Sequence, residues 1–244
     1  MEKISTTTFT TKELLKMRQR DKIHHFLLAD GKVRGAFVNG TLMVKEMRLN
    51  FGHGILETYV LGQAYLAAAL LSANLKGNDR LSLAIDCTGP IKGLSVEVTA
   101  TGEVRGHLKA RSIPLEKPLE SFDISPFLGA GFLTVTKYLE DAKQPYEGKV
   151  PIMHGSMAKD LADYFLSSEQ TPSAFALSIQ FDADGEVTGA GGLFLQAMPD
   201  AEPTLVEDLE KMVEALPSIG GFLCETPDPV DFLTTNFANF DLKI

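Results

Sequence analysis

The segment from Tyr59 to Leu75 reads YVLGQAYLAAALLSANL and is the most apolar run of the chain. A helix at a protein surface has one apolar stripe, whereas this run is apolar nearly all round and predicts a helix buried on most sides. It falls short of the roughly 20 residues that cross a bilayer, and it contains the polar residues Gln63, Ser72 and Asn74. We therefore expect residues 57–75 to form the core helix of a protein that has no membrane span.

Segments with a two-residue period lie on both sides of this helix. In one of them Leu81, Leu83, Ile85 and Cys87 fall on one face, while small or polar residues fall on the other. This alternation is typical of a strand with one buried face. Strands are predicted at 81–87, 94–98, 132–136 and 175–181, and short apolar stretches interrupted by glycine predict further strands within 23–38 and at 187–198.

Helical periodicity returns in the second half of the chain. Ser156 is the expected N-cap of a helix over residues 157–169. Thr204 and Glu207 have the spacing of a capping box and precede a second apolar stripe at helical spacing. Residues 230–240 predict a last short helix.

These elements predict an α+β fold with a mixed or antiparallel sheet core packed on helices, followed by a C-terminal helical segment. We expect a loose N-terminal arm at residues 1–20, a core domain at 21–200 and a helical segment at 201–244. The interpretation rests on the polar, Thr-rich start of the chain and on the change to helical spacing after residue 200.

Composition excludes several classes of protein. The formal net charge is −9, which argues against a nucleic-acid surface, because phosphate binding needs clustered Lys and Arg. Two cysteines in 244 residues exclude a disulfide framework and a four-cysteine zinc site within this chain. The start of the chain lacks the apolar segment of a signal peptide, so we expect a cytoplasmic protein.

Two glycine-containing motifs have functional and structural interpretations. Asp182, Asp184 and Gly185 resemble the start of a calcium loop, but the position of the last ligand is Gly191. A hairpin turn is therefore the favoured interpretation of this motif. The glycines at 189–192 weakly resemble a dinucleotide fingerprint, but they run into a strand, where glycine usually marks a bulge or a close backbone approach.

No set of side chains makes a convincing active site. Cys87 lies on the apolar side of its strand and is expected to be inert, while Glu225 beside Cys224 disfavours a reactive thiolate. The five histidines have no metal-ligand spacing, and they are His24, His25, His53, His107 and His154. The residues alone predict a soluble α+β protein that is not an enzyme.

Several longer motifs along most of the chain occur in the same order as in a known protein family. They include DKIHHFLLADGKVRGAFV at 21–38, Tyr164-Phe165 followed by SEQ at 168–170, and AGGLFLQ at 190–196 followed by Met198-Pro199. Together, over residues 21 to 240, the sequence resembles the heat-shock protein 33 family, the redox-regulated 33 kDa chaperonins. It departs from the family at Ala84 and at Cys87-Thr88, where the family usually has Gln and Gly.

The resemblance implies a stress-response holdase that binds unfolded or partly folded client proteins without ATP and forms a homodimer, with no nucleic-acid or membrane partner. It also implies that zinc belongs to a C-terminal module with C-x-C and C-x-x-C pairs, which is not found in these 244 residues. For this chain we therefore expect no cofactor, no bound zinc, and activity that does not depend on an oxidant. A small-molecule or nucleotide-binding enzyme with its site at 189–192 is the alternative.

The amphipathic spacing of two segments indicates a surface for binding client proteins. One face of the strand that ends near Met198 and the apolar stripe of the following helix are the expected contact surface. The residues of this hypothesis are Leu193, Leu195, Met198, Leu205, Leu209 and Met212.

Overall fold

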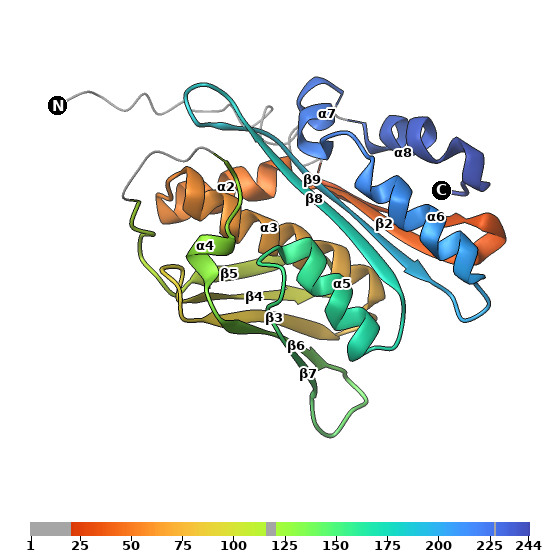
Figure 1. Ribbon diagram of the computed structural model, residues 1–244, viewed down its shortest axis with the longest axis horizontal. Helices are drawn as coiled ribbons and strands as arrows, with labels where there is room; N and C mark the ends of the chain where they lie inside the picture. The colour runs from red at the N-terminus through yellow and green to blue at the C-terminus, as the bar shows by residue number, and fades with distance from the viewer. Residues whose placement is uncertain (1–20, 116–120, 227) are drawn as a thin grey trace.

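The computed structural model describes residues 21–115, 121–226 and 228–244, and the predicted N-terminal arm at 1–20 lies outside these ranges. The described chain forms two sheets with helices between and outside them (Figure 1). Every strand pair in both sheets is antiparallel, so the α+β prediction is confirmed. The four-stranded sheet has the order β1 (Lys22–Leu28), β2 (Val33–Asn39), β9 (Val187–Ala197) and β8 (Ser173–Phe181). The five-stranded sheet has the order β5 (Val104–Leu108), β4 (Gly93–Thr99), β3 (Arg80–Cys87), β6 (Gly131–Tyr138) and β7 (Tyr146–Pro151).

The apolar run is helix α3 (Ile55–Leu71), which lies between the two sheets and contacts strands of both. Fifteen of its 17 residues are buried, which confirms the core helix. With the 3-10 turn Ser72–Asn74 the helical stretch reaches 20 residues, so the expectation that it is too short to cross a bilayer is wrong. Burial of 89% of its most apolar window, rather than its length, identifies it as a core helix.

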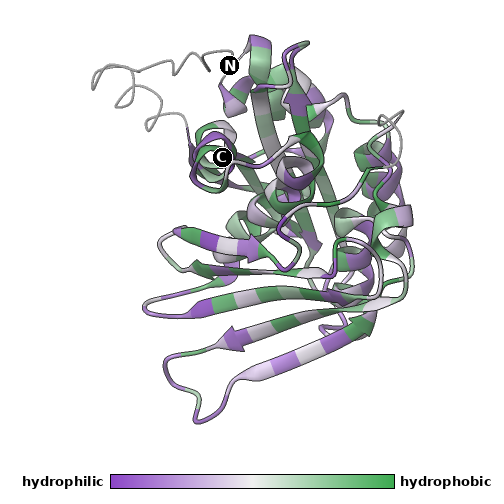
Figure 2. Ribbon diagram, turned by 90° about the vertical axis from the view of Figure 1, so that its left-hand side faces the viewer, coloured by the Kyte–Doolittle hydropathy of each residue, from purple (hydrophilic) through white to green (hydrophobic). Residues whose placement is uncertain are grey.

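The strand patterns explain how the sheets pack against this helix. Along β3, Leu81, Leu83 and Ile85 are buried, while the residues between them are more exposed. Figure 2 shows the same alternation of hydrophobic and hydrophilic residues along the five-stranded sheet. One face of that sheet therefore covers α3, and the other face lies at the surface.

Helices α2 (Thr41–Phe51) and α5 (Met157–Ser167) contact α3, while the short α4 (Ser125–Leu128) lies beside the turn between β3 and β4. The predicted helix at 157–169 is confirmed as α5, but the side chain of Ser156 makes no capping hydrogen bond. The buried carboxylate of Asp160 instead accepts backbone N–H bonds from Met153, His154 and Ser156 at 2.9–3.0 Å. This carboxylate fixes the turn that leads into α5.

Helices α6 (Pro203–Glu214), α7 (Ile219–Glu225) and α8 (Pro229–Phe237) lie on the outer face of the four-stranded sheet (Figure 1). The predicted capping box is wrong, because α6 begins at Pro203 with Glu202 as its N-cap and without a side-chain cap. Proline has its φ already fixed near the helical value and suits the first helical position, so the helix starts before Thr204. The last predicted helix is confirmed as α8.

Candidate functional site

The outer face of the four-stranded sheet is a second hydrophobic core, separate from the one around α3. Alternation along β9 places Leu193 and Leu195 on this face and Phe194 on the opposite face, toward α3. Phe37 of β2 is paired with Leu193 across the sheet. Twelve buried residues make up this cluster, which we call the covered face: Phe26, Leu28, Val33, Phe37, Leu193, Leu195, Leu209, Ile219, Leu223, Phe232, Leu233 and Phe237.

Aromatic rings join the sheet to its helical cover. The ring of Phe37 lies 5.2 Å from that of Phe232 in α8, and the ring of Phe26 lies 5.9 Å from that of Phe237. Phe222 of α7 contacts Phe232 edge-on at 5.1 Å. Such pairs contribute about 0.5–1.5 kcal/mol beyond their buried area, so aromatic contacts anchor α8 to the sheet.

Glycines in β9 let α7 approach the sheet closely. A Cβ atom at Gly189 would overlap the carbonyl oxygen of Gly220, and one at Gly191 would overlap the side chain of Leu223. The predicted close backbone approach at these glycines is confirmed. The same contacts argue against the nucleotide alternative, because the space beside Gly189 and Gly191 is filled by α7.

The six residues expected to contact clients are brought together on this face, with one exception. Leu193, Leu195 and Leu209 are buried within it at 0%, 3% and 4% exposure. Leu205 and Met212 of α6 are half-buried and pack against the same cluster. Met198 lies apart and lines a cavity of about 660 Å³ beside Arg34, Gln196 and Pro203. Client contact through the three buried leucines requires α6 to move away, and their role stays a prediction.

Sequence reasoning missed the four aromatic residues of the covered face. Phe26 and Phe37 belong to strands that were predicted, and their period-two spacing was the signal that could have placed them on one face. Phe232 and Phe237 lie in the predicted last helix at a spacing that puts both toward the sheet. Pairing of β2 with β9 brings them next to Leu193, and nothing local in the sequence specifies that pairing.

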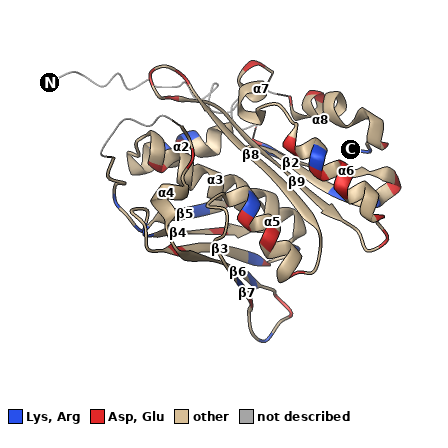
Figure 3. Ribbon diagram, viewed as in Figure 1, with Lys and Arg blue, Asp and Glu red and all other residues tan. Residues whose placement is uncertain are grey.

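Polar contacts tie the cover to the sheet at its margins. The hydroxyl of Ser178 in β8 accepts the backbone N–H of Gly220 at 3.0 Å, and Lys32 pairs with Glu202 at 3.2 Å. At the other end, Leu27 and Lys243 exchange two backbone hydrogen bonds of 2.8 and 2.9 Å. The charged residues of α6 are exposed, and Figure 3 shows that most of them are acidic. Exposed ion pairs contribute about 0–1 kcal/mol each, so apolar packing holds most of the cover in place.

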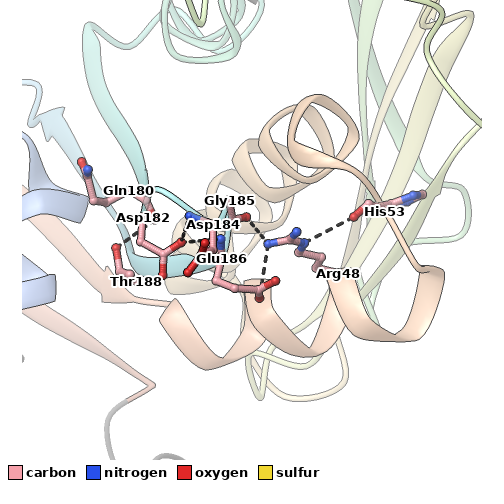
Figure 4. Close-up of polar contacts among 8 residues, drawn as sticks. All are labelled: Arg48, His53, Gln180, Asp182, Asp184, Gly185, Glu186 and Thr188. Carbon is pink, nitrogen blue, oxygen red and sulfur yellow. Dashed lines mark hydrogen bonds and ion pairs between the residues drawn. The ribbon is translucent and has the colours of Figure 1, made fainter. Parts of the chain in front are cut away.

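The turn between β8 and β9 is structural. The Asp182 carboxylate accepts the backbone N–H groups of Asp184 and Glu186 at 3.0 and 2.8 Å (Figure 4). Arg48 of α2 donates to the Gly185 carbonyl and pairs with Glu186 at 3.4 Å. The hairpin-turn prediction is confirmed, because Asp182 is engaged by its own turn.

Cysteines and histidines do not converge in the described part of the chain. Cys87 is half-buried and Cys224 is exposed on α7. Burial raises the pKa of the Cys87 thiol, which disfavours the reactive thiolate. Burial also lowers the pKa values of His24 and His53, so both imidazoles favour the neutral form. Within residues 21–115, 121–226 and 228–244, no group of three or more His, Cys, Asp or Glu side chains could hold a metal ion.

Comparison with known proteins gives consistent matches. The family model described as "Hsp33 protein" matches residues 21–244. The chain is 35% identical to the 33 kDa chaperonin of Syntrophotalea carbinolica, over 91% of this chain and 77% of that protein. It is 34% identical to the 33 kDa chaperonin of Desulforamulus reducens, over 92% of this chain and 76% of that protein. The crystal structure of the 33 kDa chaperonin of Thermotoga maritima superposes with a TM-score of 0.81 at 34% identity, over 92% of this chain and 78% of that one. A sheet face covered by three helices, together with these matches, places this chain in the Hsp33 family of chaperones.

Proposed function

We propose that this protein is an ATP-independent holdase, which binds unfolding proteins and prevents their aggregation without catalysing a reaction. The observation that carries the proposal is the cover of α6, α7 and α8, which buries six apolar side chains of the sheet together with six of its own. When the cover moves away, these side chains meet apolar segments of a client. Each Å² of apolar surface then removed from water contributes about 25 cal/mol, so no nucleotide is needed.

The lengths of the covering helices support this proposal. They have 12, 7 and 9 residues, and isolated helices shorter than about 12–15 residues are marginal in water. Their stability therefore depends on the sheet beneath them. Glu207, Asp208, Glu210 and Glu214 crowd α6 with only Lys211 to offset them, and like charges further weaken a helix that has left the sheet.

The proposal is tested by light scattering from a thermally unfolded client protein, with and without ATP. We expect the chain to suppress aggregation on warming and ATP to change nothing. We expect Leu209→Ala, which loosens α6, to suppress aggregation at a lower temperature than the wild type. Thr204→Ala, at an exposed and uncharged position of the same helix, is the control and should behave like the wild type. No suppression by any of the three proteins, or suppression that requires ATP, would contradict the holdase.

We further propose that release of the cover in this chain requires no thiol chemistry. Cys87 lies in β3 of the five-stranded sheet, while Cys224 lies in α7 on the far side of the four-stranded sheet. The layer that contains α3 separates them, so they are poorly placed to form a disulfide. Heat or a competing client is then the agent that moves the helices.

Two expectations about partners and location are part of the proposal. Homodimer formation rests on family membership, and sedimentation velocity of the purified chain tests it. A cytoplasmic location is supported by the use of only two cysteines, both free in the described structure, because reducing compartments keep thiols unpaired.

A further inference from the structure

Strand β1 forms one edge of the four-stranded sheet, with β2 on its inner side. The backbone N–H and C=O of Leu27 point away from β2, because both bond to Lys243. In an antiparallel strand these directions repeat at every second residue, so the backbone groups of His25 and Ile23 also point outward. Among the described residues, neither has a backbone partner on that side. Two residues of β1 therefore present unpaired donors and acceptors at the surface.

The chain's own C-terminal residues show what this edge accepts. Lys243 pairs with Leu27 as an antiparallel bridge, with N–H···O distances of 2.8 and 2.9 Å. Leu242 packs against the covered face, and Ile244 is 56% exposed on the other side. An extended segment thus lies along β1 and directs alternate side chains to the two sides of the sheet.

Cavities lie beside the unpaired part of the edge. One of about 430 Å³ is lined by His25, Leu27, Phe194 and Ile244 among others. A second of about 580 Å³ is lined by Ile23 and His25 and continues toward α2. His25 belongs to both, so the two cavities follow the strand in succession. They provide room for alternate side chains of a segment that pairs with Ile23 and His25.

We propose that the free edge of β1 at Ile23 and His25 binds an extended apolar segment of an unfolded protein as an added antiparallel strand. An unfolded chain carries unpaired backbone groups, which match the edge, and apolar side chains, which match the cavity beside Phe194 and Ile244. This inference rests on the proposed holdase function. It adds a directional backbone contact to the non-directional apolar contact of the covered face.

A second copy of this chain fits the edge less well than a client does. The outward backbone groups of Leu27 already bond to Lys243, so the β1 strand of a second copy could pair only with Ile23 and His25. A stable dimer buries about 800 Å² per partner, which two residue pairs do not approach. A short flexible segment has no such requirement, because the covered face supplies the rest of the binding.

The test uses fluorescence anisotropy with a fluorescein-labelled heptapeptide of alternating valine and threonine, with lysine at each end. Two full-length variants are compared. His25→Pro removes the outward N–H, and proline is tolerated on the free side of an edge strand. His25→Ala removes the imidazole but keeps that N–H. The two variants are compared with each other, because both lack the imidazole and only His25→Pro lacks the outward N–H. Loss of one hydrogen bond should weaken binding to His25→Pro by about three- to tenfold relative to His25→Ala.

A second measurement does not depend on the fold of any variant. A peptide N-methylated at every residue has no N–H to donate from either edge, so it should bind the wild-type chain at least threefold more weakly than the plain peptide. Equal binding of the two peptides, or of the plain peptide to both variants, would overturn the proposed strand addition. So would a loss of self-association in His25→Pro with peptide binding unchanged, because the edge would then belong to a second copy.

The same samples separate this inference from the holdase itself. If the wild type suppresses client aggregation but the peptide does not bind at the edge, the strand addition is wrong and the holdase proposal is retained. If the peptide binds at the edge but no client protein is protected from aggregation, the holdase proposal is wrong and the peptide-binding site is retained.

Discussion

Asp21 is a single residue whose titration should be visible in the stability of the whole protein. Its carboxylate accepts the N–H groups of Leu42 and Met43 at the start of α2, at 3.1 and 2.6 Å. Burial outweighs these bonds and raises the pKa of Asp21 to about 6. An acid with a raised pKa binds more protons when folded, so its contribution to stability is present at low pH and is lost as pH rises. We expect the free energy of unfolding to fall between about pH 4 and 6 by at most ~3 kcal/mol. The comparison is urea unfolding of the wild type and Asp21→Asn, and an unchanged pH slope in the variant would contradict this assignment.

Leu70 and Leu71 should be among the costliest residues to truncate. They are 0% and 1% exposed between the two sheets, and truncation of a buried leucine to alanine costs about 2–5 kcal/mol. Leu49 of α2, which is 73% exposed, provides the matched control, and Leu49→Ala should change stability by less than about 0.5 kcal/mol. Chemical denaturation of the three variants measures the difference, and near-wild-type stability of Leu70→Ala and Leu71→Ala would show that α3 is misplaced.

At the scale of elements, α8 should detach before the sheets unfold. Phe232 is fully buried and contacts both Phe37 and Phe222, so Phe232→Ala removes the main anchor of α8. Such a truncation costs about 3–5 kcal/mol, most of which falls on the cover. We expect amide hydrogens of α7 and α8 to exchange faster in this variant, while those of α3 keep their protection. Thr235→Ala on the exposed side of α8 is the control. Equal loss of protection in α3 and α8 would show that cover and sheets unfold as one unit.

Elements with a strong local pattern could be predicted from the sequence, and the others could not. The core helix, strands β3 and β4, the turn between β8 and β9, α5 and α8 followed from apolar periodicity and turn residues. α7 has seven residues, two of them glycine, which is too short for a helical period to emerge. Prediction of the site required the pairing of β2 with β9, in which Val33 lies opposite Ala197. Burial of Leu193, Leu195 and Leu209 follows from that long-range pairing and from the position of the cover.

At the scale of the whole molecule, client protection by this chain should be the same with dithiothreitol and with peroxide. Cys87 is half-buried with a raised pKa, and Cys224 lies in another layer. Aggregation assays under both conditions, with a zinc measurement on the purified chain, test this. Cys224→Ser should leave the result unchanged. Stoichiometric zinc, or activity that appears only after oxidation, would contradict the prediction.

The pairing of β2 with β9 has a consequence for how the chain is made. Val33 leaves the ribosome more than 160 residues before its partner Ala197, and contacts between such distant residues form slowly. During that interval the β1–β2 hairpin has neither β9 nor the C-terminal helices over Phe26 and Phe37. A nascent chain of this protein therefore exposes the kind of apolar strand that aggregates. For most of its own synthesis, this chain therefore exposes apolar strands like those of the unfolding proteins that we propose it binds.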